Sequence, residues 1–410
     1  MEKAISIYPP EEMLETCVSH LPLSKSVAAR ALILAAMSGT EVSSERLPEC
    51  VDIKVLKAAL DNPAPVADVA DSATALRFLT AYYACQRGRE VKITGSERLC
   101  QRPVAPLVDA LRALGADIEY AERDGHAPLI IKGKAIAGGE VTLNATASSQ
   151  FASALALAAP AMDNGLIIHL GGQIPSMPYL KMTLEMLGAR GVEAYTEGYD
   201  AVIKPGRLTA VEAEAEPDWS AASYWYAIAA VSAGWVTLPG LSAKSLQGDS
   251  ILKDIGERFG VLTEFTDEGA ELSATPDIYS RLDMDLSDHP DLAPALAVTG
   301  ALLGIPYVFT GVANLRHKEC DRLAALQEGL DQLGVIAEVG ADTFAWEGER
   351  HPIMTMPEID PRGDHRIAMA FAVASLALPG IVIKDPGVVD KSYPGFFDDL
   401  IAAGFTISPQ

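Results

Sequence analysis

Several positively charged side chains of this acidic chain lie within or beside apolar segments, where a charge is costly to bury. The 410 residues carry 32 Lys and Arg against 55 Asp and Glu, so most cations are expected on the surface among acids. The exceptions are Lys25, Arg30, Arg77, Arg102, Arg316, Lys318, Arg322, Arg366 and Lys391. Any one of them alone is commonly an internal ion pair, but helix N-termini combined with converging Arg and Lys bind phosphate and carboxylate without a metal. The set predicts a site for a ligand with more than one anionic group.

Neutral donors and two carboxylates accompany these cations. Hydroxyls and one amide stand at comparable helix starts, as a hydroxylated, sugar-like ligand would require; they are Ser26, Ser148, Ser149, Gln150 and Ser176. Asp291 follows Pro290 ahead of an apolar helix, and Glu319 lies between Lys318 and Arg322. Both carboxylates are candidates for proton transfer. The simpler alternatives are helix caps for the serines and Asp291, and an ion pair for Glu319.

Two repeated kinds of helix are predicted to carry these residues. Six Ala-rich helices are apolar on every side, which is typical of helices in a domain interior. Their predicted caps are Ser24, Asp71, Ser148, Asp218, Asp288 and Asp364. An amphipathic helix, a glycine and a short alternating strand also recur, with the glycines at Gly115, Gly191, Gly260, Gly334 and Gly404. Alternating helical and strand periods indicate an α/β architecture.

The repeats predict about six units, arranged as two domains of three. The first domain is expected at residues 22–215 and the second at residues 1–21 plus 216–410, so the N-terminal strand would belong with the C-terminal half. The acidic stretch at residues 212–219 is the predicted linker. The first two caps are closer together than any later pair, so we expect the first unit to lack a pair of strands.

Composition narrows the partners and the compartment. The net charge of −23 disfavours nucleic acid and anionic membrane surfaces, and Pro294, Gly304 and Pro306 divide the longest uncharged stretch. The five scattered cysteines and seven histidines lack disulfide or metal-ligand spacing, which indicates a reducing cytoplasm and no catalytic metal. No signal-peptide pattern and no nucleotide-binding glycine motif occurs. We expect no cofactor and a monomer.

The motifs, taken in order, resemble one family along nearly the whole chain. They are LPLSKSVAARAL, DSATALRFL, QRPVAPLVDALRALGA, SSQF, PDWSAASYW, LQGD, NLRHKECDRL, DHRIAMAF and DKSYPGFFDDL. These segments are similar to those of the 5-enolpyruvylshikimate-3-phosphate (EPSP) synthase family. The resemblance implies an inside-out α/β barrel of six β-α-β-α-β-β units in two halves joined by two crossovers. It also implies enolpyruvyl transfer from phosphoenolpyruvate to the 5-hydroxyl of shikimate 3-phosphate, through a tetrahedral intermediate that releases phosphate, in the shikimate pathway of aromatic amino acid biosynthesis.

Motif by motif, the resemblance implies a role for each candidate residue. Contacts with phosphoenolpyruvate would come from Lys25, Ala73, Arg102, Gln150, Arg322, Arg366 and Lys391. Contacts with shikimate 3-phosphate would come from Lys25, Ser26, Arg30, Ser148, Ser149, Gln150, Ser176, Tyr179, Asp291, Asn314 and Lys318. Asp291 is then the candidate base for the 5-hydroxyl, while Glu319, with Lys25, would deliver and later remove the proton at the methylene carbon. Domain closure around shikimate 3-phosphate is expected to exclude water.

Two positions depart from the family pattern. Leu23 stands where a glycine usually precedes the S-K-S motif, so a residue suited to positive φ is lost at the first crossover. Ala73 replaces a glycine that in many bacterial members lies against phosphoenolpyruvate and the longer inhibitor glyphosate. Because the additional methyl group would crowd the longer molecule more, we predict reduced sensitivity to glyphosate.

Two alternative functions are considered beside this one. The related UDP-N-acetylglucosamine enolpyruvyl transferase shares the fold and the chemistry, but its usual Lys-Asn pair is replaced here by Lys25 and Ser26. The other alternative is a non-catalytic relative, to which Leu23 and the short first unit would point. Retention of Asp291, Glu319 and the cations argues against it.

Overall fold

The chain folds into two compact units, each with a hydrophobic core of its own. A computed structural model describes residues 4–62, 64–144, 148–172, 174–210 and 215–410. Unit 1 comprises Met1–Pro22 and Glu216–Gln410, and unit 2 comprises Leu23–Ala215. The expected linker at residues 212–219 lies partly outside the described residues. None of the helices in the described part of the chain has the length and apolarity needed to cross a membrane.

Five four-stranded sheets repeat one pairing pattern within the described residues. Each has a parallel pair of strands at one edge and two further strands that join antiparallel. In unit 2 the orders are β3 (Val66–Asp68), β4 (Glu90–Thr94), β6 (Leu129–Lys132), β5 (Asp117–Tyr120), and β7 (Gly139–Thr142), β8 (Leu166–His169), β10 (Asp200–Ile203), β9 (Ala194–Glu197). The same four-stranded sheet therefore recurs in both units.

Unit 1 contains the other three sheets, and one of them joins distant parts of the chain. The orders are β18 (Glu358–Ile359), β19 (Ile381–Lys384), β1 (Ala4–Tyr8), β20 (Thr406–Pro409); β12 (Val261–Phe265), β13 (Gly269–Ala274), β11 (Trp235–Pro239), β2 (Glu15–Cys17); and β14 (Leu282–Asp285), β15 (Tyr307–Thr310), β17 (Thr343–Trp346), β16 (Glu338–Val339). Strand β1 lies between β19 and β20. The first strand of the chain therefore completes a sheet of the C-terminal half.

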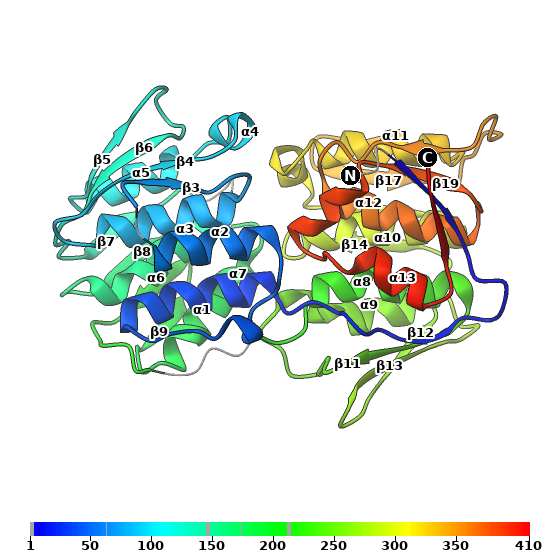
Figure 1. The fold of residues 1–410 in the computed structure, drawn as a ribbon, viewed down its shortest axis with the longest axis horizontal. Coiled ribbons are helices and arrows are strands. Elements are labelled where there is room, and N and C mark those ends of the chain that lie inside the picture. Colours follow the sequence, from blue (N-terminus) through cyan, green and yellow to red (C-terminus); the bar gives the residue numbers. More distant parts are fainter. Residues whose placement is uncertain (1–3, 63, 145–147, 173, 211–214) are drawn as a thin grey trace. The chain divides into compact units, whose positions relative to one another are not determined.

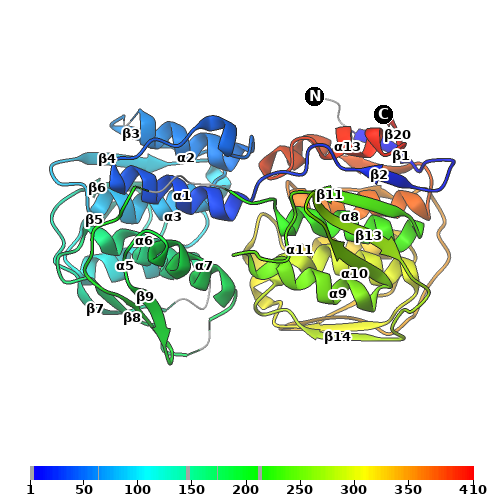
Figure 2. The same cartoon turned by 90° about the horizontal axis from the view of Figure 1, so that it is seen from below.

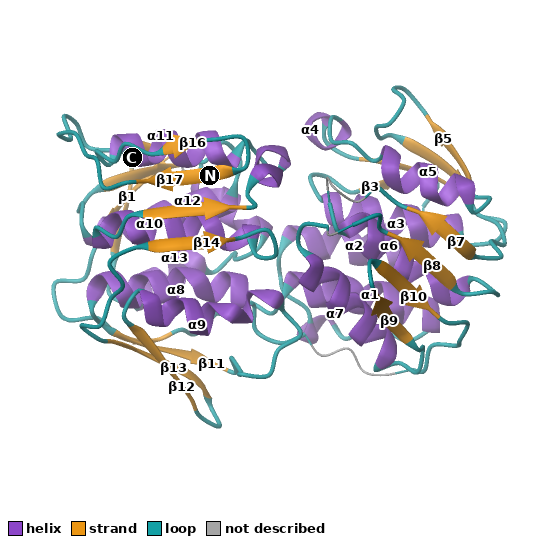
Figure 3. Cartoon of the chain, turned by 180° about the vertical axis from the view of Figure 1, so that it is seen from behind, coloured by secondary structure: helices purple, strands orange, loops and turns teal. Residues whose placement is uncertain are grey.

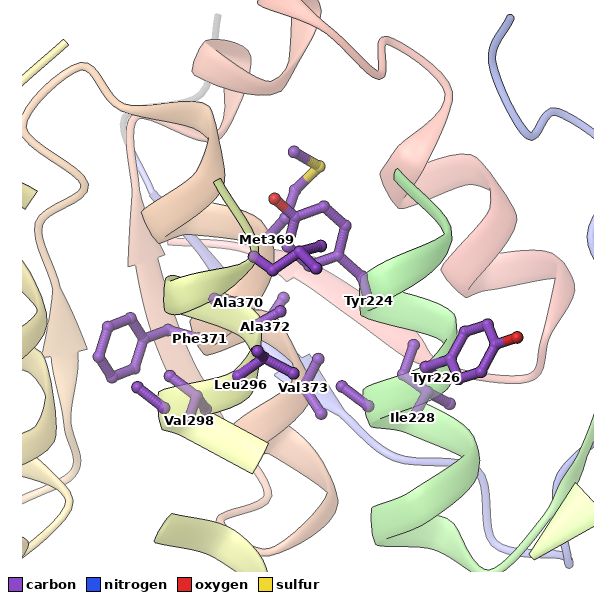
Figure 4. Close-up of a cluster of buried hydrophobic side chains, with 14 of the residues drawn as sticks. Tyr224, Tyr226, Ile228, Leu296, Val298, Met369, Ala370, Phe371, Ala372 and Val373 are labelled. Atoms are coloured by element: carbon purple, nitrogen blue, oxygen red, sulfur yellow. The ribbon is translucent and has the colours of Figure 1, made fainter. Parts of the chain in front are cut away.

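Six apolar helices lie inside the units and the sheets lie outside them (Figures 1 and 2). They are α1 (Lys25–Ser38), α3 (Ala73–Ala84) and α6 (Gln150–Ala158) in unit 2, and α8 (Trp219–Ser232), α10 (Ala293–Leu303) and α12 (His365–Ala372) in unit 1. Side chains such as Ile228, Leu296 and Phe371 bring α8, α10 and α12 together in the core of unit 1 (Figure 4). The prediction of buried, all-apolar helices is confirmed.

The remaining helices, also drawn in Figure 3, have a smaller share of buried residues than these six. They are α2 (Val51–Asp61), α4 (Glu97–Cys100), α5 (Ala105–Ala113), α7 (Met177–Gly188), α9 (Leu252–Arg258), α11 (Arg322–Gln332) and α13 (Phe396–Ala402). Between Lys25 and Pro65 the described residues form α1, a short 3-10 turn and α2, but no strand. This matches the expectation that the first unit lacks a strand pair.

The helix caps follow the sequence pattern at three of six positions. Ser24, Asp218 and Asp364 accept hydrogen bonds from backbone N–H groups at the starts of α1, α8 and α12. Asp71 is not the cap of α3; Ser72 is, and Asp71 instead accepts a hydrogen bond from the Ser96 hydroxyl. Either residue type suits a cap, so the pattern alone could not distinguish two neighbouring residues.

The other two predicted caps are also displaced. Ser149 immediately precedes α6 and its side chain makes no capping hydrogen bond, whereas the Ser148 hydroxyl accepts from the backbone N–H of Gln150, the first residue of α6, at 3.2 Å. Asp288 lies several residues ahead of α10, because a 3-10 turn at Pro290–Leu292 begins the segment. That turn carries Asp291.

Leu23 does not show the strain that loss of a glycine would cause. Among the described residues other than glycine, positive φ occurs at Ala70, Ser176, Ala233, Arg362 and Asp385. Leu23 is outside this set, so its backbone in this structure needs no glycine. The substitution therefore costs no backbone strain in the conformation observed.

Candidate functional site

In unit 1, three cations surround the carboxylate of Asp291. Asp291 Oδ1 lies 2.9 Å from Arg322 Nη1 and 3.2 Å from Lys318 Nζ, and Oδ2 lies 3.1 Å from Arg366 Nη2. The three partners come from different elements: Lys318 follows the 3-10 turn at Ala313–His317, Arg322 begins α11, and Arg366 is the second residue of α12. The structure thus brings four of the predicted site residues into one cluster.

This arrangement sets the charge of Asp291. Burial by itself would raise the pKa of Asp291, but the positive charges of Arg366, Lys318 and Arg322 together hold it well below its usual value of 3.8. For Lys318, burial is the larger effect and lowers the pKa below 10.5, against the raising influence of Asp291. Asp291 is therefore ionised at neutral pH.

Arg322 joins Asp291 to two further carboxylates. Its side chain is almost fully buried, with Nη2 2.7 Å from Glu319 Oε2 and Nε 2.6 Å from Asp364 Oδ2. Burial lowers the pKa of Arg322, but Asp364, Glu319 and Asp291 outweigh this effect and raise it above its usual value. Glu319 is also approached by Lys391, with 4.0 Å between Oε1 and Nζ. Both carboxylates proposed for proton transfer thus share one arginine.

Two residues near this cluster were not predicted from the sequence to belong to the site. Asp364 caps α12 through the N–H of Arg366 and also binds Arg322, so it fixes both arginines. Tyr224 is fully buried; burial raises its pKa to about 12, with Arg366 and Arg322 acting in the opposite direction. The Asp-His-Arg triplet at the start of α12 could have indicated from the sequence that Asp364 belongs to the site. Tyr224 could not have been found in this way, because the sequence of α8 does not distinguish it from the other buried positions of that helix.

Asn314 stands in the short turn that precedes Lys318. Its side-chain oxygen is buried and has no hydrogen-bond partner. A buried polar oxygen without a donor is costly, and such groups are common where a ligand supplies the missing bond. This accords with a ligand-binding role for Asn314.

In unit 2, Arg30 organises one group of predicted residues. The guanidinium donates to Thr183 Oγ1 at 2.7 Å, the Ser26 carbonyl at 2.8 Å, the Tyr179 carbonyl at 2.9 Å and Ser153 Oγ at 3.2 Å. It is 2% exposed, and burial lowers its pKa to about 10. Four of its five N–H donors therefore hold α1, α6 and α7 together, which leaves one for a ligand.

A second group in unit 2 surrounds Gln150. Arg77 Nη1 donates to Gln150 Oε1 at 2.6 Å and to Ser148 Oγ at 3.2 Å, while Gln150 Nε2 donates to Thr74 Oγ1 at 3.1 Å. The guanidinium of Arg77 also lies over the ring of Phe151, 5.0 Å from its centroid. These bonds fix the first turns of α3 and α6 beside each other. The sequence identified Arg77 as a buried cation, but its hydrogen bond to Gln150 could be recognised only from the structure.

Ser176 has a backbone conformation typical of functional positions. It precedes α7 with φ of 60°, is 7% exposed, and its hydroxyl makes no capping hydrogen bond. A residue other than glycine in this region is strained, and such strain persists where the surroundings require it. Tyr179 lies one turn later, with its ring 5.9 Å from the Arg30 guanidinium carbon.

The remaining predicted residues of unit 2 stand at other helix starts. Lys25 is the first residue of α1, and its Nζ lies 3.1 Å from Asp52 Oδ2 of α2, a partner that was not predicted. Ala73 is the first residue of α3 and is 8% exposed. Arg102 lies between α4 and α5 and is partly buried.

Comparison with known proteins agrees with this geometry. The family model for EPSP synthase (3-phosphoshikimate 1-carboxyvinyltransferase) matches residues 56–400. A protein of Bacteroides fragilis (strain ATCC 25285) named 3-phosphoshikimate 1-carboxyvinyltransferase is 44% identical over 391 residues, which is 95% of each chain. A protein of the same name from Methanosphaerula palustris is 33% identical and covers 98% of this chain and 100% of its own.

A solved structure extends the comparison to the fold. The EPSP synthase from Acinetobacter baumannii superposes with a TM-score of 0.78, at 23% identity and over 99% of both chains. The predictions of the family and of the inside-out α/β fold are confirmed. With a family match over most of its length and a close relative along 95% of it, this chain belongs to the EPSP synthase family.

Proposed function

We propose that this chain catalyses enolpyruvyl transfer from phosphoenolpyruvate to shikimate 3-phosphate, with release of phosphate. The observation that carries the proposal is the cluster in which Lys318, Arg322 and Arg366 surround Asp291 while Glu319 shares Arg322. Relatives along 95% of the chain carry the name of this activity. Its substrates are therefore expected to be two small anions, with no cofactor.

The proton transfers are proposed for two carboxylates. Asp291 would accept the proton of the 5-hydroxyl as that oxygen attacks C2 of phosphoenolpyruvate, and Glu319, with Lys25, would deliver a proton to the methylene carbon. The product of this step is a tetrahedral intermediate that still holds the phosphate. Removal of a proton from the new methyl group and breakage of the carbon–oxygen bond to phosphate then give the enol ether and free phosphate.

The low pKa of Asp291 has a consequence for this step. A carboxylate held by three cations is a weak base. Phosphate and carboxylate groups of the substrates would compete for Lys318, Arg322 and Arg366, and each cation drawn away raises the pKa of Asp291. We infer that substrate binding itself makes Asp291 basic enough to act.

The binding roles are proposed separately for each unit. In unit 1, Arg322, Arg366 and Lys391 would bind phosphoenolpyruvate, and Asn314 and Lys318 would bind shikimate 3-phosphate. In unit 2 the proposed residues for phosphoenolpyruvate are Lys25, Ala73, Arg102 and Gln150. Those for shikimate 3-phosphate are Ser26, Arg30, Ser148, Ser149, Gln150, Ser176 and Tyr179. Arg30 has one N–H donor available for this purpose and otherwise holds Ser26 and Tyr179 in place.

The experiment is phosphate release from phosphoenolpyruvate with shikimate 3-phosphate, with UDP-N-acetylglucosamine, and with neither. We expect release only with shikimate 3-phosphate. Release with the nucleotide sugar alone would assign the chain to the related transferase, and no release with either would indicate a non-catalytic relative.

A further inference from the structure

Asp399 of α13, another buried carboxylate of unit 1, does not contact the residues of the Asp291 cluster described above. Its side chain has no exposed surface, yet three donors surround it. Oδ1 accepts from the backbone N–H of His20 at 3.1 Å and lies 2.8 Å from His20 Nδ1, and Oδ2 accepts from the Tyr393 hydroxyl at 2.6 Å. Asp399 therefore links His20, through one carboxylate oxygen, to Tyr393, through the other.

Tyr393 extends this network into the core. Its hydroxyl accepts a hydrogen bond from Trp225 Nε1 of α8 at 3.1 Å, and its ring packs edge-on against Phe396, with centroids 5.5 Å apart. Burial, and then the charge of Asp399, raise the pKa of Tyr393 far above 10. The hydroxyl therefore keeps its proton and its orientation.

The network reaches the proposed substrate contacts through the loop that carries Lys391. Tyr393 is two residues after Lys391, and its backbone N–H donates to the Val389 carbonyl at 2.8 Å, closing the turn in which Lys391 stands. Lys391 has a long, flexible side chain, so the place of its ammonium group depends on how firmly this turn is held. Tyr393 holds the turn from its C-terminal side.

Stability alone does not account for a polar group at position 399. Asp399 is the fourth residue of α13, where it caps no helix start, and it is 1% exposed. A well-packed apolar residue commonly gives equal or greater stability than a buried charged group. His20 is also fitted to this place, because a Cβ atom at Gly395 would lie 3.1 Å from His20 Cβ. The network favours one defined position of the loop.

We propose that Asp399 is a positioning residue for Lys391, acting through the Tyr393 hydroxyl, in the binding of phosphoenolpyruvate. This inference rests on the proposed function, which gives Lys391 its ligand. The residues it links, Lys391, Tyr393 and Asp399, belong to the single motif DKSYPGFFDDL.

The test is steady-state kinetics of Tyr393→Phe and Asp399→Asn at saturating shikimate 3-phosphate. We expect the KM for phosphoenolpyruvate to rise about tenfold, the size of one lost hydrogen bond to a charged group, while kcat and the KM for shikimate 3-phosphate stay within about threefold. Asp398→Asn is the matched control, because it makes the same charge change on the exposed side of the same helix. Tyr393→Phe removes one oxygen, so it remains informative if Asp399→Asn does not fold.

A double-mutant cycle separates positioning from general loosening. In a Lys391→Met background, Tyr393→Phe should raise the KM for phosphoenolpyruvate by less than twofold, since the residue it positions is gone. An unchanged KM in Tyr393→Phe, an equal effect in Asp398→Asn, or full additivity with Lys391→Met would each overturn the inference while the wild-type enzyme stays active. A wild-type protein that releases no phosphate would instead refute the proposed function, and this inference with it.

Discussion

Among single residues, Asp291 is distinguished by three cations that contact its carboxylate. Only part of the arrangement is encoded locally: Lys318, Glu319 and Arg322 are close in sequence, whereas Asp291 and Arg366 arrive from other helices. A change at Asp291 should therefore alter both the chemistry and the balance of buried charge.

The loss of the Asp291 carboxylate as a proton acceptor is expected to lower kcat. Asp291→Asn keeps the shape of the side chain but cannot accept a proton, so kcat should fall at least about 100-fold, the scale of general-base catalysis. Phosphate release under saturation with both substrates measures it. Asp285→Asn, an exposed residue at the end of β14, makes the same charge change and should retain kcat. Activity of Asp291→Asn within tenfold of wild type would exclude Asp291 as the base.

The effect of the Asp291 charge on the folded protein is expected to appear in the pH dependence of the unfolding free energy. Because the pKa of Asp291 is lowered in the folded protein, its contribution to stability is present above its unfolded value of about 3.9 and is lost as the pH falls toward the folded value. The difference in unfolding free energy between wild type and Asp291→Asn should narrow from pH 5 to pH 3. Urea denaturation at a series of pH values measures it, and a constant difference would contradict the lowered pKa.

Ala73 yields a prediction about inhibition. Its methyl group is buried at the start of α3, where the family commonly has glycine. Ala73→Gly should lower the glyphosate concentration needed for half inhibition at equal phosphoenolpyruvate, because it removes the group expected to crowd the inhibitor. Ala81→Gly makes the same change later in α3 and should leave inhibition unaltered. Equal inhibition of wild type and Ala73→Gly would refute the idea.

At the scale of elements, α3 shows what a sequence pattern resolves and what it does not. Apolar composition predicts that the helix exists and is buried, because no face of it is polar. The choice between Asp71 and Ser72 as its cap depends on the turn after β3, where Asp71 is drawn to Ser96. Cap identity is therefore decided by the loop and not by the helix.

This difference can be measured through stability. Ser72→Ala removes the hydroxyl that accepts the Ala75 N–H, and should cost about 1 kcal/mol of unfolding free energy. Asp71→Ala removes a surface hydrogen bond and should cost less. Denaturation midpoints of the two variants, at equal slope, measure this. A larger loss for Asp71→Ala would restore Asp71 as the important residue.

The site elements were predicted better than their connections. Sequence reasoning found Lys25, Arg30 and Gln150 because cations and amides at apolar helix starts are unusual. It could not reveal that Arg30 uses most of its donors inside unit 2, or that Lys25 pairs with Asp52, since these partners are set by how the helices pack. Burial alone does not distinguish a ligand-binding arginine from one that holds helices together.

At the scale of the whole molecule, the repeated unit explains why the fold could be anticipated. The same pairing of one parallel and two antiparallel steps occurs in five sheets, so one recognised unit predicts most of the architecture. The domain limits at residues 22 and 215, the cytoplasmic location and the absence of nucleic acid or membrane partners stay predictions. A repeat pattern does not specify where one domain ends, in which compartment the protein works or which partners it binds.

The oligomeric state is a separate prediction. We expect a monomer, so light scattering after size-exclusion chromatography should give a mass near 43.4 kDa. The high negative charge should keep this mass unchanged over a range of protein concentrations. A mass near twice that value would contradict the prediction.

The placement of β1 between β19 and β20 bears on how the chain folds during its synthesis. All the strands of unit 2 are present once residue 215 has left the ribosome, whereas β1 is made first and its partners are made last. At ribosomal rates, β1 waits on the order of 20–80 s for them. Throughout that interval, Ile5 and Ile7 have no sheet in which to be buried. Until β19 and β20 are made, the nascent chain thus carries an unpaired apolar strand, a natural target for chaperones that bind extended hydrophobic segments.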